Sequence, residues 1–162
     1  MENTLTYIKG NLLDAQEKVI AHQVNCRGVM GGGIAKSIKK KYPIVYEKYL
    51  ERYKEEKGRE EMLAGTIDII YANENRTVIN LYGQDSYGRN GRYTNYAYLS
   101  SAFLKMFERL RLNGIEAVAV PYKIGCGLGG GDWTIIESLL LDFGRTYNVK
   151  VKVYYLEEYL RG

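Results

Sequence analysis

This 162-residue sequence has few cysteines, prolines and histidines, and it has no long hydrophobic run. The two cysteines, Cys26 and Cys126, have neither the spacing of a zinc site nor the number that a disulfide framework needs. No apolar run approaches the ~18 residues that span a bilayer, and the first residues lack the apolar segment of a signal peptide. We therefore expect a cytoplasmic protein without a metal, a cofactor or a membrane span.

An ordinary charge content, a small net charge and few prolines exclude further classes of protein. Two prolines and a charged fraction of 26% are not the composition of a disordered chain. The formal net charge of +4 is small for a nucleic-acid-binding domain, so stable binding to nucleic acid is not expected. We interpret the basic run at residues 39–41 as a solvated helix face.

Glycine, in contrast, is abundant, and half of the 18 glycines lie in two clusters, at residues 28–33 and 125–131. This clustering differs from the strict repeat of collagen and from the composition of a flexible linker. The length and the hydrophobic fraction of 46% predict a single domain with one core over residues 1–162.

Hydrophobic periodicity predicts strands and amphipathic helices in an interleaved order. Apolar or alternating runs predict strands at residues 5–8, 19–21, 66–71, 76–81, 115–120 and 149–155. Helical spacing predicts helices at residues 33–41, 43–56 and 132–143, and a further helix that Thr94 or Asn95 caps and that ends near Gly114. About six strands and four helices in this order predict an α/β fold, a three-layer α/β/α sandwich with a mixed sheet.

Each glycine cluster lies between a predicted strand and a predicted helix. Such a junction points free backbone N–H groups and a helix N-terminus at an anion, and glycine lets the backbone reach positive φ and approach a phosphate closely. One such loop can simply join two elements, whereas two indicate a diphosphate, or a phosphate and a sugar. Gly125, Gly127 and Gly130 also match GxGxxG, but too little chain follows for a dinucleotide-binding unit.

The two loops read AHQVNCRGVMGGGIA at residues 21–35 and PYKIGCGLGGGDW at residues 121–133, with NLYGQ at residues 80–84 between them. In this order, and with Val153 and Tyr154 on the last strand, they resemble the macrodomain family of ADP-ribose-binding modules over nearly the whole chain. The sequence is most similar to the branch with ADP-ribose-1″-phosphate phosphatases, terminal ADP-ribose glycohydrolases and DNA ADP-ribosyl glycohydrolases. The resemblance implies the family's fold and ADP-ribose or a derivative as the ligand. We expect a monomer.

The resemblance also implies binding roles for particular residues. Asn25 matches the asparagine that binds the distal ribose, and Tyr154 matches an aromatic residue near the adenine. Asn11 stands where many relatives have an aspartate that accepts from the adenine amino group. The ligand contacts that the resemblance implies are Gly10, Asn11, Leu12, Asn25, Gly31, Gly32, Gly33, Ile34, Ala35, Gln84, Ile124, Gly125, Cys126, Gly127, Leu128, Gly129 and Tyr154.

The family's catalytic residues are only partly present. Gln84 stands where the glycohydrolase relatives have a lysine, and Gly129 stands where terminal ADP-ribose glycohydrolase has an aspartate, so lysine-dependent deglycosylation is not expected. The remaining candidates for catalysis are His22, Asn25, Asp85 and Asp132. His22 has a suitable ordinary pKa, but a partly buried strand histidine bonded to a backbone carbonyl is the alternative. For Asp132 we favour a helix N-cap, and Asp85 can be merely solvated.

Three functions are open at this point. The first, which we expect, is a phosphatase that removes the terminal phosphate of ADP-ribose-1″-phosphate, with His22 and either Asp85 or Asp132 managing protons. The second is a module that reads ADP-ribose without turnover, which the missing lysine and aspartate favour. The third is an ADP-ribosyl hydrolase that acts on a modified protein or nucleic acid with water activated by the ligand's own phosphate.

Overall fold

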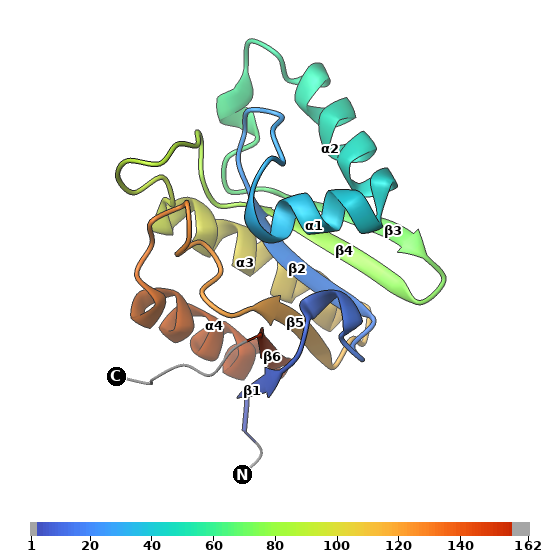
Figure 1. Ribbon diagram of the computed structural model, residues 1–162. Coiled ribbons are helices and arrows are strands. Elements are labelled where there is room, and N and C mark those ends of the chain that lie inside the picture. The colour runs from blue at the N-terminus through green and yellow to red at the C-terminus, as the bar shows by residue number, and fades with distance from the viewer. Residues whose placement is uncertain (1–2, 157–162) are drawn as a thin grey trace.

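The computed structural model describes residues 3–156 and shows strands and helices interleaved along this part of the chain (Figure 1). The strands are β1 (Leu5–Lys9), β2 (Val19–Val24), β3 (Ile67–Asn73), β4 (Arg76–Tyr82), β5 (Ala117–Pro121) and β6 (Lys150–Tyr155). The helices are α1 (Gly33–Lys41), α2 (Pro43–Glu55), α3 (Tyr96–Leu112) and α4 (Trp133–Tyr147), with two short 3₁₀ helices, η1 (Leu12–Asp14) and η2 (Glu60–Met62). Within residues 3–156, no helix combines the length and the apolar character that a bilayer span requires.

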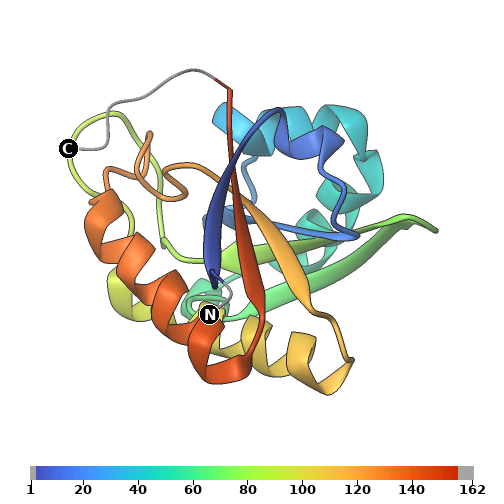
Figure 2. The same cartoon turned by 90° about the horizontal axis from the view of Figure 1, so that it is seen from below.

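The six strands form one mixed sheet in the order β1-β6-β5-β2-β4-β3. The β3–β4 pair is antiparallel, and the other neighbouring pairs are parallel. The helices α1 and α2 cover one face of the sheet and α3 and α4 cover the other, as Figure 2 shows. The predicted α/β/α sandwich is therefore confirmed.

The apolar core is divided into two clusters, one on each face of the sheet, instead of the one core expected from the composition. Along β2, Val19 and Ala21 belong to the core under α3 and α4, whereas Ile20 and Val24 belong to the core under α1 and α2. Because helices cover both faces, every residue of β4 and nearly every residue of β2 is buried.

The helix ends follow their local signals, with shifts of a few residues from the predicted bounds. Asn95 caps α3, because its side chain accepts from the backbone N–H of Tyr98. Gly114, just beyond α3, has a φ of 67°, as a residue after a helix C-cap commonly does. The last helix runs four residues longer than predicted, to the point where Asn148 adopts a φ of 55°.

Candidate functional site

The two glycine clusters meet where the chain leaves the sheet in opposite directions. β2 and β5 are parallel neighbours, but the chain passes from β2 to α1 on one face and from β5 to α4 on the other. Such a switch point leaves a crevice at the carboxyl ends of the strands. The first loop (residues 25–32), the second loop (residues 122–132) and the third loop (residues 83–95) all lie at this edge of the sheet.

Three adjoining cavities follow this edge and form one cleft. The inner cavity, of about 410 Å³, is lined by all three loops, and the middle cavity, of about 250 Å³, lies between the start of α1 and the second loop. The outer cavity, of about 550 Å³, lies beside η1 and the end of β6. The middle cavity shares Gln84 and Leu128 with the inner cavity, and Gly33 and Ile34 with the outer cavity.

Several residues with unpartnered backbone N–H groups line the middle cavity. Gly32 is the N-cap residue of α1 and has no side chain to engage the N–H groups of the first helical turn, which carries no acidic residue. In the second loop, the N–H groups of Gly125, Gly127, Leu128 and Gly129 have no acceptor among residues 3–156. Unpartnered N–H donors beside a helix N-terminus attract an anion.

The N-terminus of α4 is not available in the same way. The Asp132 carboxylate accepts from the Thr134 backbone N–H at 2.9 Å and from the Thr134 hydroxyl at 2.6 Å, and these bonds lower the pKa of Asp132. The expectation that both glycine loops present a helix terminus is therefore wrong for α4, because its own N-cap occupies it. The N-cap interpretation of Asp132 is confirmed, and its side chain lines none of the three cavities.

The glycines of the second loop have two distinct roles. A Cβ on Gly129 would lie 2.5 Å from Thr94 Oγ1, and a Cβ on Gly131 would lie 2.8 Å from the Gly125 carbonyl oxygen. A Cβ on Gly127 would meet no heavy atom within 4 Å. Gly129 and Gly131 thus let the loop close on itself, whereas Gly127 leaves space beside the middle cavity.

Side-chain amides and one hydroxyl connect the loops beneath the cleft. Gln23 Nε2 donates to Gln84 Oε1 at 2.6 Å and to Thr94 Oγ1 at 2.8 Å. The Thr94 hydroxyl donates to the Gly125 carbonyl at 2.6 Å, and Gln84 Nε2 donates to the Ser86 carbonyl at 2.7 Å. Gln84 lines the inner and middle cavities, but both ends of its amide bind to the protein itself.

Asn25 lies directly after β2 and lines the inner cavity with 7% of its surface exposed. Its Oδ1 accepts from the Arg27 backbone N–H at 2.9 Å and from the Tyr49 hydroxyl at 2.7 Å. Its Nδ2 donates to the Val29 carbonyl at 2.8 Å. The carboxamide is therefore held in a single orientation at the cavity wall.

The outer cavity contains the residues that the resemblance places near an adenine. Asn11 caps η1, because its side chain accepts from the Leu13 backbone N–H at 2.9 Å. The Tyr154 hydroxyl donates to the Glu17 carboxylate at 2.7 Å, and Tyr154 lines the cavity together with Gly10, Asn11 and Leu12. The Asn11 side chain is thus engaged in its own turn.

His22 lies inside the sheet and lines none of the three cavities. Its Nε2 is 2.6 Å from Asn80 Oδ1, and because Asn80 Nδ2 donates to Asp68, Oδ1 accepts and Nε2 carries the hydrogen. Burial lowers the pKa of His22 to about 4, so the ring is neutral at pH 7. The expectation that His22 manages protons at the cleft does not fit this position. The buried strand histidine does fit, although its partner is a side-chain amide instead of a backbone carbonyl.

Two further candidate residues lie off the cleft wall. Asp85 is about half exposed and pairs with Arg27 at 2.9 Å. Cys126 donates weakly to the Ile124 carbonyl, and burial raises the pKa of its thiol to about 11. Neither lines any of the three cavities. The other expected contacts each line at least one cavity, namely Gly31, Gly32, Gly33, Ile34, Ala35, Ile124, Gly125, Gly127, Leu128 and Gly129.

Several residues that line the cleft were not expected from the sequence. Tyr87 and Arg89 of the third loop line the inner cavity, and Tyr122 lies between the middle and outer cavities. Among the described residues, Arg89 is the one charged residue that lines the inner cavity. The alternation of glycine with polar residues in GQDSYGRNGR was the available signal, but it predicts a loop and not the direction in which the loop folds.

Comparisons with known proteins agree with this arrangement. The Macro domain family model matches residues 21–140. The DNA ADP-ribosyl glycohydrolase of Mycobacterium tuberculosis is 30% identical over 140 residues, which cover 85% of this chain and 38% of that protein. The ADP-ribose 1″-phosphate phosphatase of Saccharomyces cerevisiae is 28% identical over 168 residues, which cover 87% of this chain and 93% of that protein. The chain thus spans less than half the length of the glycohydrolase and nearly all of the phosphatase.

The fold is also similar to that of a solved structure. The solved structure of Thermosipho africanus DarTG in complex with ADP-ribose matches with a TM-score of 0.80 and 23% identity, over 99% of this chain and 44% of that chain. The family match covers both glycine loops and most of the sheet. The chain therefore belongs to the Macro domain family.

Proposed function

We propose that this chain binds ADP-ribose along the cleft, with the diphosphate in the middle cavity, the adenosine in the outer cavity and the distal ribose in the inner cavity. The observation that carries the proposal is the set of residues with unpartnered backbone N–H groups that line the middle cavity, between two larger cavities. A diphosphate with a bulky group at each end complements this arrangement. The ADP-ribose complex of the T. africanus relative supports it.

The activity that we propose is hydrolysis of ADP-ribose 1″-phosphate. Water attacks phosphorus, the bond between phosphorus and the ribose oxygen breaks, and ADP-ribose and inorganic phosphate leave. Arg89 favours this substrate, because the guanidinium can bind the phosphate oxygens in the inner cavity and stabilise the charge of the transition state. The match to the yeast phosphatase along nearly its full length also supports it. His22 has no part in this proposal, because its imidazole is enclosed by the sheet.

Binding without turnover is the second candidate, and one observation favours it. Among residues 3–156, no Asp, Glu, His or Lys side chain lines the inner cavity, so no side-chain acid or base stands beside the distal ribose. A monomeric state and a cytoplasmic location stay predictions.

The test is calorimetry with ADP-ribose, followed by phosphate release from ADP-ribose 1″-phosphate. We expect one-site binding and phosphate release, and we expect Arg89→Ala to slow the release by about tenfold to a hundredfold. Arg92→Ala is the matched control, because Arg92 stacks over the Tyr96 ring at 4.5 Å and lines none of the cavities. Binding without release identifies a reader, and absence of binding contradicts the proposal.

A further inference from the structure

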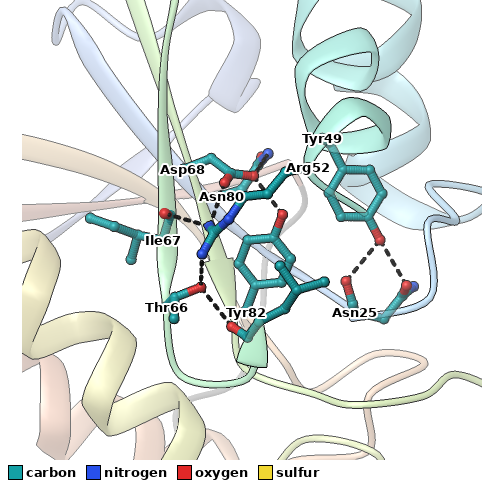
Figure 3. Close-up of polar contacts among 9 residues, drawn as sticks. Asn25, Tyr49, Arg52, Thr66, Ile67, Asp68, Asn80 and Tyr82 are labelled. Atoms are coloured by element: carbon teal, nitrogen blue, oxygen red, sulfur yellow. Dashed lines mark hydrogen bonds and ion pairs between the residues drawn. The ribbon is translucent and has the colours of Figure 1, made fainter. Parts of the chain in front are cut away.

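Three tyrosines of α2 contact the first loop, although no residue of α2 lines the cleft. The Tyr46 hydroxyl donates to the Gly28 carbonyl at 3.3 Å, and the Tyr53 ring lies so close that a Cβ on Gly28 would be 2.8 Å from it. The Tyr49 hydroxyl lies 2.7 Å from Asn25 Oδ1 and 2.8 Å from the Asn25 carbonyl oxygen (Figure 3). The shape of the first loop therefore depends on a helix outside the cleft.

The contacts of Asn25 decide which atom it offers to the inner cavity. Two donors lie within hydrogen-bond distance of Oδ1, which has two lone pairs: the Arg27 N–H and the Tyr49 hydroxyl, whose single hydrogen Oδ1 shares with the Asn25 carbonyl oxygen. Nδ2 has two N–H groups and donates one of them to the Val29 carbonyl. No second acceptor for Nδ2 is present among residues 3–156. The group available to a ligand is therefore an N–H donor, which suits a ribose hydroxyl or phosphate oxygen.

The Tyr49 side chain is itself rigidly held. It is fully buried, and its ring stacks on Tyr82 with the centroids 5.9 Å apart and the planes at 29°. The Tyr82 hydroxyl donates to Asp68 Oδ2 at 2.7 Å, and Arg52 of α2 pairs with Asp68 Oδ1 at 2.7 Å (Figure 3). Burial raises the pKa of the Tyr49 phenol well above its usual value, so the hydroxyl stays a donor at physiological pH.

We propose that Tyr49 is a positioning residue for ligand binding, whose hydroxyl fixes the Asn25 carboxamide so that an N–H faces the distal ribose. This inference rests on the proposed binding of ADP-ribose. If the hydroxyl is removed, Oδ1 loses one of its two donors, and the carboxamide can turn its oxygen toward the cavity. The binding affinity then decreases for ligands that reach Asn25 and does not change for ligands that end at the diphosphate.

The test compares ADP-ribose with ADP, which lacks the distal ribose, in the Tyr49→Phe variant. We expect the affinity for ADP-ribose to fall about tenfold and the affinity for ADP to stay within about twofold. In an Asn25→Ala background, Tyr49→Phe should cause no further loss, because the group that it positions is gone. The inference is overturned if Tyr49→Phe lowers the affinity for both ligands equally. It is also overturned if Tyr49→Phe lowers the affinity for ADP-ribose as much in the Asn25→Ala background as in wild type.

The matched control is Tyr82→Phe, which also removes one buried hydroxyl, but the Tyr82 hydroxyl donates to Asp68 and not to Asn25. It should lower the unfolding midpoint about as much as Tyr49→Phe and leave the affinity for ADP-ribose unchanged. Equal weakening of ADP-ribose binding by both variants contradicts a positioning role, because it points to a general loss of packing.

A second readout does not depend on the proposed function. The Asn25 side-chain amide gives its own ¹⁵N–¹H signals, and in the ligand-free protein its order parameter should fall in Tyr49→Phe and stay unchanged in Tyr82→Phe. If the order parameter is the same in wild type and Tyr49→Phe, the positioning claim is wrong. If it falls but wild type does not bind ADP-ribose, the positioning claim holds and the proposed function fails.

Discussion

Acid should destabilise this protein through His22 in a way that can be measured directly. Burial lowers the pKa of His22 from 6.5 to about 4, with Asn80 and Asp68 opposing the decrease. Nδ1 is buried without a partner among residues 3–156, so a proton there has no acceptor. The unfolded chain takes up this proton at a higher pH than the folded protein does. The contribution of neutral His22 to the free energy of unfolding is therefore fully present above pH 6.5, decreases as the pH falls, and is lost near pH 4.

The magnitude follows from the two pKa values. Each pH unit between 6.5 and 4 costs about 1.4 kcal/mol, so complete protonation costs about 3 kcal/mol, and about 2 kcal/mol of this is lost between pH 7 and pH 5. The assay is urea unfolding of wild type and His22→Gln at several pH values. Groups other than His22 titrate in both proteins, so the difference between the two curves isolates His22. Parallel curves would contradict this prediction, because they would mean that His22 is solvated or already paired.

Three substitutions test other parts of the account. Gly129→Ala should lower the free energy of unfolding in urea by about 1–3 kcal/mol, because its Cβ would lie 2.5 Å from Thr94 Oγ1. An unchanged urea midpoint would show that the second loop has room for a Cβ. Asp132→Ala should lower the melting temperature by about 3 °C, because the N-cap of α4 is lost, and should leave phosphate release unchanged. Loss of phosphate release would instead indicate a catalytic role for Asp132. Arg52→Met should cost about 2 kcal/mol, because the Asp68 carboxylate, 9% exposed, loses its ion pair; a neutral effect in unfolding would contradict this.

The sequence predicts the sandwich and the two binding loops because both depend on local signals. Strand and helix periods are read within one element, and the glycine clusters mark the junctions where the backbone leaves the sheet. Asn25 and the start of α1 follow β2 directly, so their place at the cleft follows from chain order alone. The N-cap role of Asp132 is equally local, since its partner Thr134 is two residues away.

The parts that could not be predicted depend on contacts between distant segments. The burial of His22 results from helices covering both faces of β2 and from the pairing of β2 with β4, which places His22 opposite Asn80. Tyr49 reaches Asn25 across 24 positions, and its helical spacing with other tyrosines indicates only an apolar face. Arg89 lies at the inner cavity because of the path of the third loop, which no periodic pattern specifies.

Binding of ADP-ribose in the cleft is best tested by calorimetric titration of wild type and Gly127→Val with ADP-ribose. A Cβ at residue 127 would meet no heavy atom within 4 Å, and Gly127 lines the middle cavity, where the diphosphate is proposed to lie. We expect one-site binding to wild type, and loss of binding in Gly127→Val with an unchanged melting temperature. Absence of binding to wild type, or equal affinity in the two proteins, would contradict the claim that the glycine loops form an ADP-ribose cleft.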